Sequence, residues 1–252
     1  MSRQRTPAVV LRRWPYSESS LAVHLLTPGQ GVVSVLAKGV HRPTSGSWGV
    51  LDTWALVEAE YGGHESREML TLYGARLLDR CSGLARDPEH LIAAGLVAEL
   101  AELAAPPGMS ADAAFDYLMR RLRQLDAGVD VPGFLCAALL EGLDLLGLGP
   151  LLDAGPGVRA SWQWFSPAAG GVLPAGAPRP AEHARRVSTD ALEWLARLRA
   201  AGPAPGVVAE RAPARVADAL TILGEFAAYH LERPPRAWSL LRARGRRLAR
   251  LR

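Results

Sequence analysis

Residues 20–40 read SLAVHLLTPGQGVVSVLAKGV, and this stretch decides the fold. Two runs of alternating or β-branched apolar residues flank TPGQG, whose proline and two glycines supply the bend of a hairpin. The stretch therefore predicts two antiparallel strands joined by a short turn.

Three further runs of the same kind lie on either side of this hairpin, within residues 6–80. They are PAVVLRRW before it, and TWALVEAEY and MLTLYGARLL after it. Five strands in about 75 residues favour a small barrel. A five-stranded Greek-key barrel of the OB type is the leading prediction, because its size fits and its open face commonly holds oligonucleotides. An SH3-like barrel is the structural alternative.

After Asp87 the apolar residues recur at intervals of three and four, which is typical of helices. The predicted helices lie within DPEHLIAAGLVAELAELAA, SADAAFDYLMRRLRQLDAG, PGFLCAALLEGLDLLGLG, STDALEWLARLRAA and ARVADALTILGEFAAYHLE. The buried stripes expected in the first two consist of Leu91, Ala94, Gly95, Ala98 and Leu100 to Leu103, and of Phe115, Leu118, Leu122 and Leu125.

The sequence thus predicts an α+β multidomain protein. Residues 1–80 are expected to form the OB barrel, and residues 81–252 an α-helical domain. Within the latter, an irregular Gly/Pro-rich insert with one hairpin is expected at about 149–187, and a basic tail at 233–252.

Composition limits the possible partners without choosing among them. The formal charge of +4 and the pI near 9.5 suit nucleic acid, an acidic protein tail or an anionic membrane. The two cysteines, Cys81 and Cys136, suggest neither a disulfide framework nor a thiol metal site. The N-terminal MSRQRTPAVV has no apolar h-region, and no run of 18 uncharged apolar residues follows. We expect a cytoplasmic protein.

Four motifs occur in a characteristic order: VLRRWPYSESSLAVHLLTPGQGVVSVLAKG, LDLLGLGPLLD, FSPAAGGVL and YHLERPPR. In this order the chain resembles the RecO family of bacterial recombinational repair proteins, over about residues 6–240. The resemblance implies an N-terminal OB barrel, a helical C-terminal domain, and a nucleoid-associated protein that binds single- and double-stranded DNA and anneals complementary strands. It also implies work with RecR, with the C-terminal tail of the single-strand-binding protein SSB and, indirectly, with RecA.

The sequence departs from this family at one place. Many members carry a four-cysteine zinc motif, and the corresponding places here are held by Gly155, Gly157, Pro174 and Ala177. His183 and Asp153 alone cannot complete a four-coordinate site, so we expect no metal and no cofactor. The aromatic cluster WQWF at 162–165 is expected to stabilise this segment as local core, in preference to a base-stacking platform.

Lys38 is the only lysine, against 28 arginines, and follows the third predicted strand in AKGVHRP. Gly39 permits close backbone approach, so Lys38, His41 and Arg42 are predicted to contact DNA phosphates. A solvated loop charge is the alternative for Lys38 and Arg42. Arg12 and Arg13 are further candidates, although consecutive strand residues point to opposite faces and at most one can join Lys38. The aromatic residues that could stack on bases are Trp14, Tyr16, Trp48 and Tyr61, for each of which core packing is an open alternative.

A second candidate surface lies at the end of the last predicted helix. The segment RPPR brings Arg233 and Arg236 near Tyr229, and an arginine beside apolar groups suits the acidic, apolar SSB tail. Simple capping of the helix by these arginines is the alternative. The following basic segment, with Trp238, Leu241, Leu248 and Leu251 near helical spacing, predicts either a nucleic-acid contact or a solvated end.

No catalytic arrangement is recognisable. The cluster Ser17, Ser19 and Ser20 lacks a nucleophile-elbow frame, and the histidines are scattered. We therefore expect a DNA-binding protein that is not an enzyme. Two other classes stay open at this point: an OB-fold adaptor that binds proteins, and an RNA-binding protein.

Overall fold

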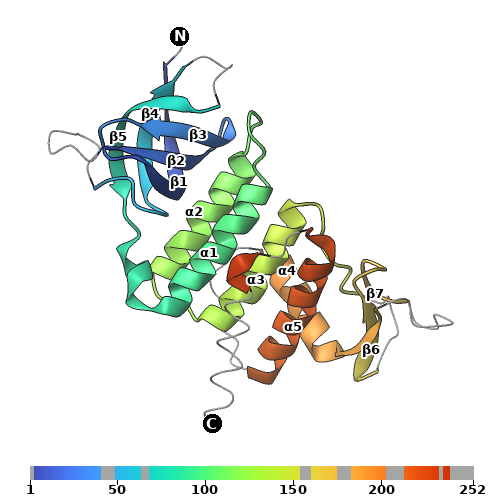
Figure 1. The fold of residues 1–252 in the computed structure, drawn as a ribbon. Helices are drawn as coiled ribbons and strands as arrows, with labels where there is room; N and C mark the ends of the chain where they lie inside the picture. The colour runs from blue at the N-terminus through green and yellow to red at the C-terminus, as the bar shows by residue number, and fades with distance from the viewer. Residues whose placement is uncertain are drawn as a thin grey trace. The chain divides into compact units, whose positions relative to one another are not determined.

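The computed structural model describes residues 3–40, 49–63, 68–153, 160–174, 183–202, 213–232 and 235–238. The chain forms two compact units, Met1–Gly128 and Val129–Arg252. In the described residues, the first unit contains a five-stranded barrel, a short 3-10 helix and two α-helices, and the second contains three α-helices and a small sheet (Figure 1). The predicted α+β fold with an N-terminal OB-type barrel is confirmed. The predicted boundary at residue 80 coincides with the end of the last barrel strand. That residues 1–80 and 81–252 are separate domains stays a prediction.

The barrel contains β1 (Arg3–Ser17), β2 (Ser20–Thr27), β3 (Gly31–Ala37), β4 (Leu56–Gly62) and β5 (Leu70–Asp79). It closes in the order β1-β2-β3-β5-β4, with β3 and β5 parallel and every other pair antiparallel. The long first strand makes closure possible, because its first half pairs with β4 and its second half with β2.

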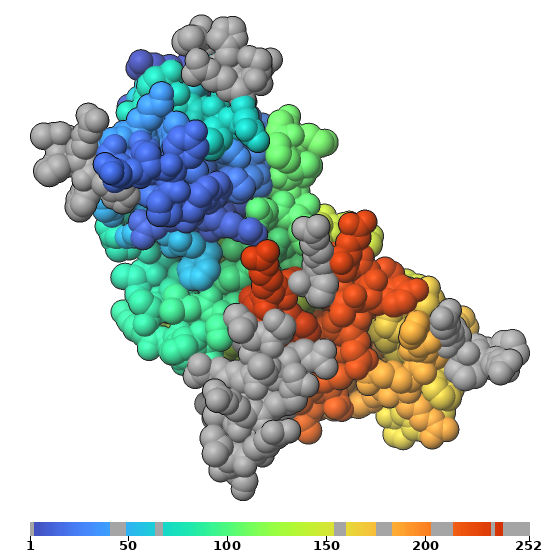
Figure 2. Space-filling model, viewed as in Figure 1, coloured from blue at the N-terminus to red at the C-terminus, as the bar shows by residue number. Residues whose placement is uncertain are grey.

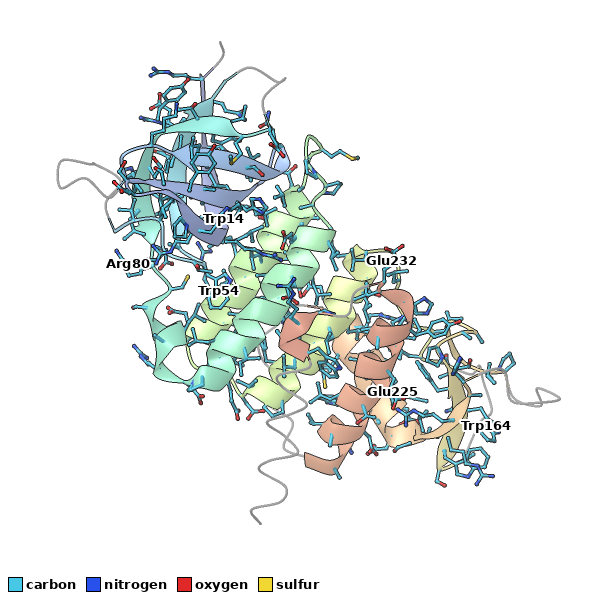
Figure 3. The ribbon with its side chains drawn as sticks, viewed as in Figure 1. Trp14, Trp54, Arg80, Trp164, Glu225 and Glu232 are labelled. Carbon is cyan, nitrogen blue, oxygen red and sulfur yellow. The ribbon has the colours of Figure 1, made fainter. Side chains whose placement is uncertain are left out.

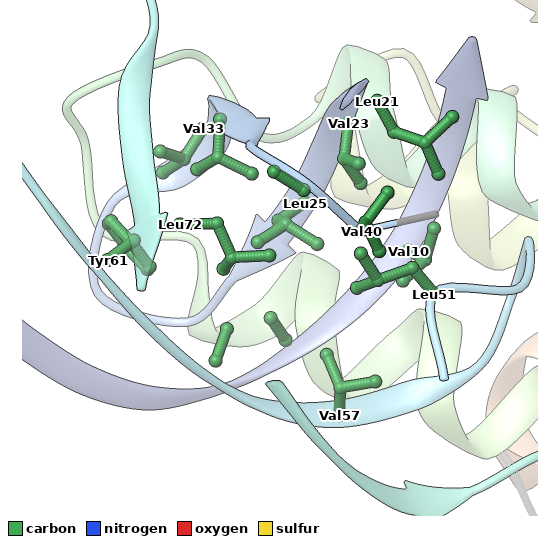
Figure 4. Close-up of a cluster of buried hydrophobic side chains, with 14 of the residues drawn as sticks. Val10, Leu21, Val23, Leu25, Val33, Val40, Leu51, Val57, Tyr61 and Leu72 are labelled. Carbon is green, nitrogen blue, oxygen red and sulfur yellow. The ribbon is translucent and has the colours of Figure 1, made fainter. Parts of the chain in front are cut away.

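Alternate residues of each strand fill the barrel, as the period of two requires (Figure 4). The core includes Val10, Leu21, Val23, Leu25, Val33, Val35, Val57, Tyr61 and Leu72, together with Val40 and Leu51 from the segments between β3 and β4. The hydroxyl of Tyr61 donates to Gln30 Oε1 at 3.2 Å, and Gln4 Nε2 donates to the same oxygen at 2.6 Å. The buried hydroxyl group of Tyr61 thus has a hydrogen-bond partner inside the protein.

The outward-facing residues of β1 and β2 are buried as well. Val9, Leu11, Ala22 and Leu26 are at most 4% exposed, although they lie outside the barrel core. The other described elements of this unit are η1 (Ser82–Arg86), α1 (Pro88–Leu103) and α2 (Asp112–Asp126). Helix α2 contacts β2, and Glu102 of α1 binds Arg12 of β1, so these helices cover this face of the barrel.

The loop between α1 and α2 closes one end of the barrel. It bonds the β2–β3 turn through Val32 N to Ala105 O at 3.1 Å and Gly108 N to Gln30 O at 3.0 Å. Lys38 lies at the other end of β3. There, no backbone hydrogen bond among the described residues joins the barrel to these helices.

Helix α1 begins as predicted, with Pro88 in the first turn and the Asp87 carboxylate accepting from Glu89 N at 2.8 Å. The prediction that Leu91 and Leu103 belong to its buried stripe is wrong, because both are exposed. Apolar residues surround most of this helix, so their spacing does not reveal which side faces the core. In α2 the predicted Leu118, Leu122 and Leu125 are buried.

The second unit packs α3 (Val131–Leu145), α4 (Thr189–Ala201) and α5 (Pro213–His230) against a three-stranded sheet. The predicted hairpin exists as β6 (Trp162–Ser166) and β7 (Gly171–Val172), and β8 (Arg185–Ser188) adds a third strand in the order β7-β6-β8. Arg199 of α4 donates two hydrogen bonds to Asp144 of α3, at 3.0 and 2.9 Å. No helix in the described ranges is both long and apolar enough to span a bilayer.

Trp238 packs directly on α5. A Cβ atom added to Gly224 would lie 2.8 Å from Cη2 of the Trp238 indole and closer still to two other ring atoms. The ring is almost fully buried, and Trp238 N donates to Pro235 O at 3.0 Å. Trp238 is therefore part of the core of this unit, whereas Leu241, Leu248 and Leu251 lie outside the described residues.

The first prediction concerns the turn that the helices cover. Gly31 has a φ of +61°, and a Cβ there would lie 2.8 Å from Ala105 O and closer to Pro106 O. Gly31→Ala should lower the free energy of unfolding by at least ~2 kcal/mol, since the left-handed conformation alone costs about 1–2 kcal/mol. Gly29→Ala is the matched control, because Gly29 lies in the same turn with open space around it. This change should alter the free energy of unfolding, measured in urea, by less than ~0.5 kcal/mol. Equal effects at both glycines would contradict this packing.

The second prediction concerns Gly224. Gly224→Ala should destabilise the chain by about 1–3 kcal/mol, because the methyl group collides with the Trp238 ring. In a Trp238→Ala background the collision is absent, and the same change should stabilise α5 by up to about 1 kcal/mol through helix propensity. Thermal unfolding of the four chains measures both differences. The same sign in both backgrounds would show that Trp238 does not pack on Gly224.

Candidate nucleic-acid interface

Lys38 follows the last residue of β3 and is exposed. The next residue, Gly39, has a φ of +65°, which explains why a glycine is needed there. A surface hollow of about 350 Å³ lies beside them, lined by Tyr16, Ser17, Ser19, Ser20, Leu36, Lys38 and Gly39. The end of β3 and the β1–β2 hairpin thus form one site. Both belong to the N-terminal part of the chain, which Figure 2 draws in blue.

The hollow is rich in hydrogen-bond donors. Gly39 N donates to Ser20 Oγ at 3.4 Å, and Ser17 and Ser19 contribute two more hydroxyl groups to its lining. An ammonium group and several hydroxyls are suited to phosphate oxygens, which accept hydrogen bonds only. The serines were not predicted as site residues, although their clustering as SESS in the first hairpin was a usable signal.

Two exposed aromatic side chains lie in the last residues of β1. Tyr16 lines the hollow and is 57% exposed, and Trp14 is 40% exposed with its ring 4.8 Å from that of His24 in an edge-on arrangement (Figure 3). Burial lowers the pKa of His24, an effect that the nearby Glu102 carboxylate opposes, so the imidazole carries little charge at neutral pH. Tyr61 is fully buried in the barrel, so the suggestion that it stacks on bases is wrong. Trp48 lies outside the described residues.

Arg12 and Arg13 point to opposite faces of β1, as their adjacency predicts. Arg12 is paired across the sheet with His24, and Arg13 with Val23. Arg12 forms an ion pair with Glu102 at 2.6 Å, and Arg13 forms one with Asp52 at 3.1 Å. Both charges are already compensated by carboxylates, and neither side chain lines the hollow beside Lys38.

Lys38 differs from these arginines. In the portion of the chain that the structure describes, no carboxylate lies within ion-pair distance of its ammonium group. His41 and Arg42, the other predicted members of this loop, lie outside the described residues. Among the described residues, Lys38 is therefore a cation of the hollow without a carboxylate partner.

The second candidate surface is only partly described. Tyr229 of α5 is 50% exposed, and its ring lies 5.1 Å from His230 and 5.7 Å from His183. His230 Nε2 in turn lies 2.9 Å from Pro167 O, which joins this end of α5 to the β6–β7 turn. Arg236 is exposed, whereas Arg233 lies outside the described residues.

The aromatic cluster of β6 is divided between core and surface. Phe165 is buried, with its ring 5.9 Å from Phe226 of α5, as the local-core prediction requires. Trp162 is exposed and Trp164 partly so, which core packing alone does not explain. Arg186, which sequence reasoning missed, lies over the Trp162 ring.

Neither cysteine is suited to nucleophilic chemistry. Burial raises the pKa of Cys81 to about 11, and it raises that of Cys136 also, so both are thiols at neutral pH. Among the described residues, no group of three or more His, Cys, Asp or Glu side chains is placed to hold a metal ion. Of the four positions assigned to the zinc motif from the sequence, Gly155, Gly157, Pro174 and Ala177, only Pro174 lies in the described part. The absence of zinc stays a prediction.

Comparison with known proteins covers nearly the whole chain. Residues 1–80 match the family described as Recombination protein O N terminal, and residues 85–239 match Recombination protein O C terminal. The chain is 31% identical over 237 residues to the DNA repair protein RecO of Anaeromyxobacter dehalogenans strain 2CP-1, covering 92% of this chain and 93% of the relative.

Other relatives give the same result. The DNA repair protein RecO of Anaeromyxobacter sp. strain Fw109-5 is 34% identical over 92% of both chains. That of Desulforudis audaxviator is 33% identical over 97% of this chain and 98% of its own length. The chain therefore belongs to the RecO family, the non-catalytic mediators of recombinational DNA repair.

Proposed function

We propose that this protein binds DNA through the hollow beside Lys38 and anneals complementary single strands during recombinational repair. The observation that carries this proposal is an ammonium group with no carboxylate partner among the described residues, in a hollow that serine hydroxyls also line, at the end of β3 in an OB-type barrel. Exposed Tyr16 lines the hollow, and exposed Trp14 lies two residues before it in β1. Both rings can stack on bases, an interaction that OB folds use to bind single strands without strong sequence preference.

Annealing of this kind needs no covalent chemistry. Two complementary strands repel each other through their phosphates, and a protein that neutralises some of these charges lowers the repulsion. Base pairing then supplies the free energy. In this mechanism the protein neutralises phosphates and performs no bond-breaking step. The protonated state of the Cys81 thiol is compatible with it, and so are the ion pairs that leave Arg12 and Arg13 outside the phosphate site.

The proposed partners follow from the family. We propose that the protein binds single- and double-stranded DNA, acts with RecR, and helps RecA load indirectly on strands covered by SSB. The half-exposed Tyr229 and the exposed Arg236 are the described residues proposed for the acidic, apolar SSB tail. A guanidinium can bind a terminal carboxylate through two hydrogen bonds, and an aromatic ring can cover an apolar side chain beside it.

Two other classes of function make different predictions. An adaptor that binds only proteins would show no salt-dependent affinity for oligonucleotides, whereas phosphate binding weakens steeply with salt. An RNA-binding protein would prefer ribose to deoxyribose oligomers in direct competition, because the 2′-hydroxyl is its distinguishing contact.

The third prediction tests the hollow. Lys38→Glu should weaken single-strand binding about tenfold at low salt, since one attraction is replaced by a repulsion of similar size. The slope of log affinity against log salt should become shallower by about 0.7, the value for one phosphate contact in single strands. Fluorescence anisotropy with an oligonucleotide measures both quantities.

Arg86→Glu is the matched control for this variant, because it makes the same charge change at an exposed residue that does not line the hollow. Its salt slope should remain that of the wild type. A folded Lys38→Glu chain with unchanged affinity and slope would remove the hollow from the DNA site.

The fourth prediction tests the SSB-tail surface. Tyr229→Ala together with Arg236→Ala should weaken binding of an SSB-tail peptide at least tenfold, which corresponds to about 1.4 kcal/mol. Isothermal titration calorimetry measures this affinity. Tyr16→Ala with Arg86→Ala removes the same side-chain types from the first unit and should leave peptide binding unchanged. Wild-type affinity in the folded Tyr229/Arg236 variant would assign the tail to another surface.

A further inference from the structure

The outer face of the small sheet carries two tryptophans and an arginine in register. Trp164 of β6 is paired directly with Arg186 of β8, and Trp162 with Ser188. Alternation along β6 turns Phe165 the other way, toward Phe226 of α5. Trp162, Trp164 and Arg186 therefore share the face that does not pack on the helices, and Trp164 projects there in Figure 3.

The three side chains form a compact group, called here the Trp–Arg face. The guanidinium carbon of Arg186 lies 4.0 Å from the centre of the Trp162 ring and 5.5 Å from that of Trp164. The two indoles meet edge to face, with their centres 5.8 Å apart and their planes at 85°. The guanidinium thus lies within cation–π distance of both rings, and Trp162 remains 37% exposed.

The charge of Arg186 is not neutralised within the described residues. Its contacts there are with the two rings, whereas the adjacent Arg185 pairs with Glu225 at 2.5 Å. Two other arginines of this unit are also paired with carboxylates: Arg199 with Asp144, and Arg215 with Asp190. An arginine that stacks on tryptophan without a carboxylate retains all its hydrogen-bond donors for an anion.

We propose that the Trp–Arg face is a second binding site for single-stranded nucleic acid, distinct from the hollow beside Lys38. The exposed indole of Trp162 offers a surface on which an unpaired base can stack, and Arg186 offers its donors to the neighbouring phosphate. Duplex DNA does not fit this chemistry, because its bases are already stacked on one another. Free organic cations do not fit it either, because Arg186 occupies the cation position over the ring.

This inference rests on the proposed annealing function and gives it a physical basis. Annealing requires that one protein, or two copies of it, hold two strands at once. With the hollow in the first unit and the Trp–Arg face in the second, each chain has one site per strand.

The test uses the full-length wild-type chain. Single-stranded oligonucleotides that carry 5-iododeoxyuridine are photo-crosslinked to it, and tryptic peptides are identified by mass spectrometry. We expect crosslinks at Trp162 or Trp164, in the peptide that begins at Ala160, as well as at residues of the barrel. Lys38→Glu should reduce the barrel crosslinks and leave those at Ala160 onward within twofold of the wild type.

Two outcomes overturn the inference in different ways. Crosslinks confined to the barrel, with intact DNA binding and annealing, contradict the Trp–Arg face and leave the proposed function standing. Absence of both binding and crosslinking contradicts the proposed function together with the inference.

A variant provides an independent readout. Arg186→Gln removes the charge at an exposed position, and it should lower the Trp162/Trp164 crosslink yield and the annealing rate at least fivefold. Arg197→Gln makes the same change at an exposed position of α4 and should alter neither. If Arg186→Gln instead leaves both unchanged but abolishes a tryptophan fluorescence shift on phosphatidylglycerol vesicles, the face binds lipid and the inference is overturned.

Discussion

The parallel pairing of β3 with β5 is the constraint on which the rest of the first unit depends. Without it the four antiparallel pairs would form an open, curved sheet with two exposed edges. Pairing of Val35 with Leu70 and of Ala37 with Leu72 closes the barrel at the point where β3 ends. Closure therefore fixes Lys38 directly after the last paired residue, where it lines one hollow together with the three serines of the β1–β2 hairpin.

The distribution of compensated charge is more informative than the total. A net charge of +4 could arise from cations spread over the whole surface, but many described arginines are tied to carboxylates. These pairs shape the protein: Arg12 joins β1 to α1 through Glu102, and Arg199 joins α4 to α3 through Asp144. Lys38 and Arg186 have no such partner among the described residues, and they mark the two proposed nucleic-acid sites, one in each unit.

Much of the fold could be predicted from the sequence, because strand alternation, the TPGQG turn and the helix caps are local signals. The barrel closure could not be derived from them, since it depends on a contact between β3 and β5 that lie more than 30 residues apart. The exposed Leu91 and Leu103 show a second limit: where a helix is apolar on most sides, only its neighbours decide which side is buried. At the site, composition drew attention to Lys38, but only the structure brings Ser17, Ser19 and Tyr16 to it. Likewise, WQWF could be recognised as an aromatic cluster from the sequence. Which of its residues face the core and which face the surface could be seen only from the pairing of β6 with β8, where Trp164 lies opposite Arg186.

The most direct measurement is the rate at which the purified wild-type protein anneals complementary oligonucleotides without nucleotide or metal, followed at several salt concentrations. Charge neutralisation predicts a rate well above that of the strands alone, with no need for ATP, and a decline as salt displaces the protein from the phosphates. The proposal of annealing by charge neutralisation would be contradicted if, at low salt and with the protein bound to both strands, they annealed no faster than the free strands.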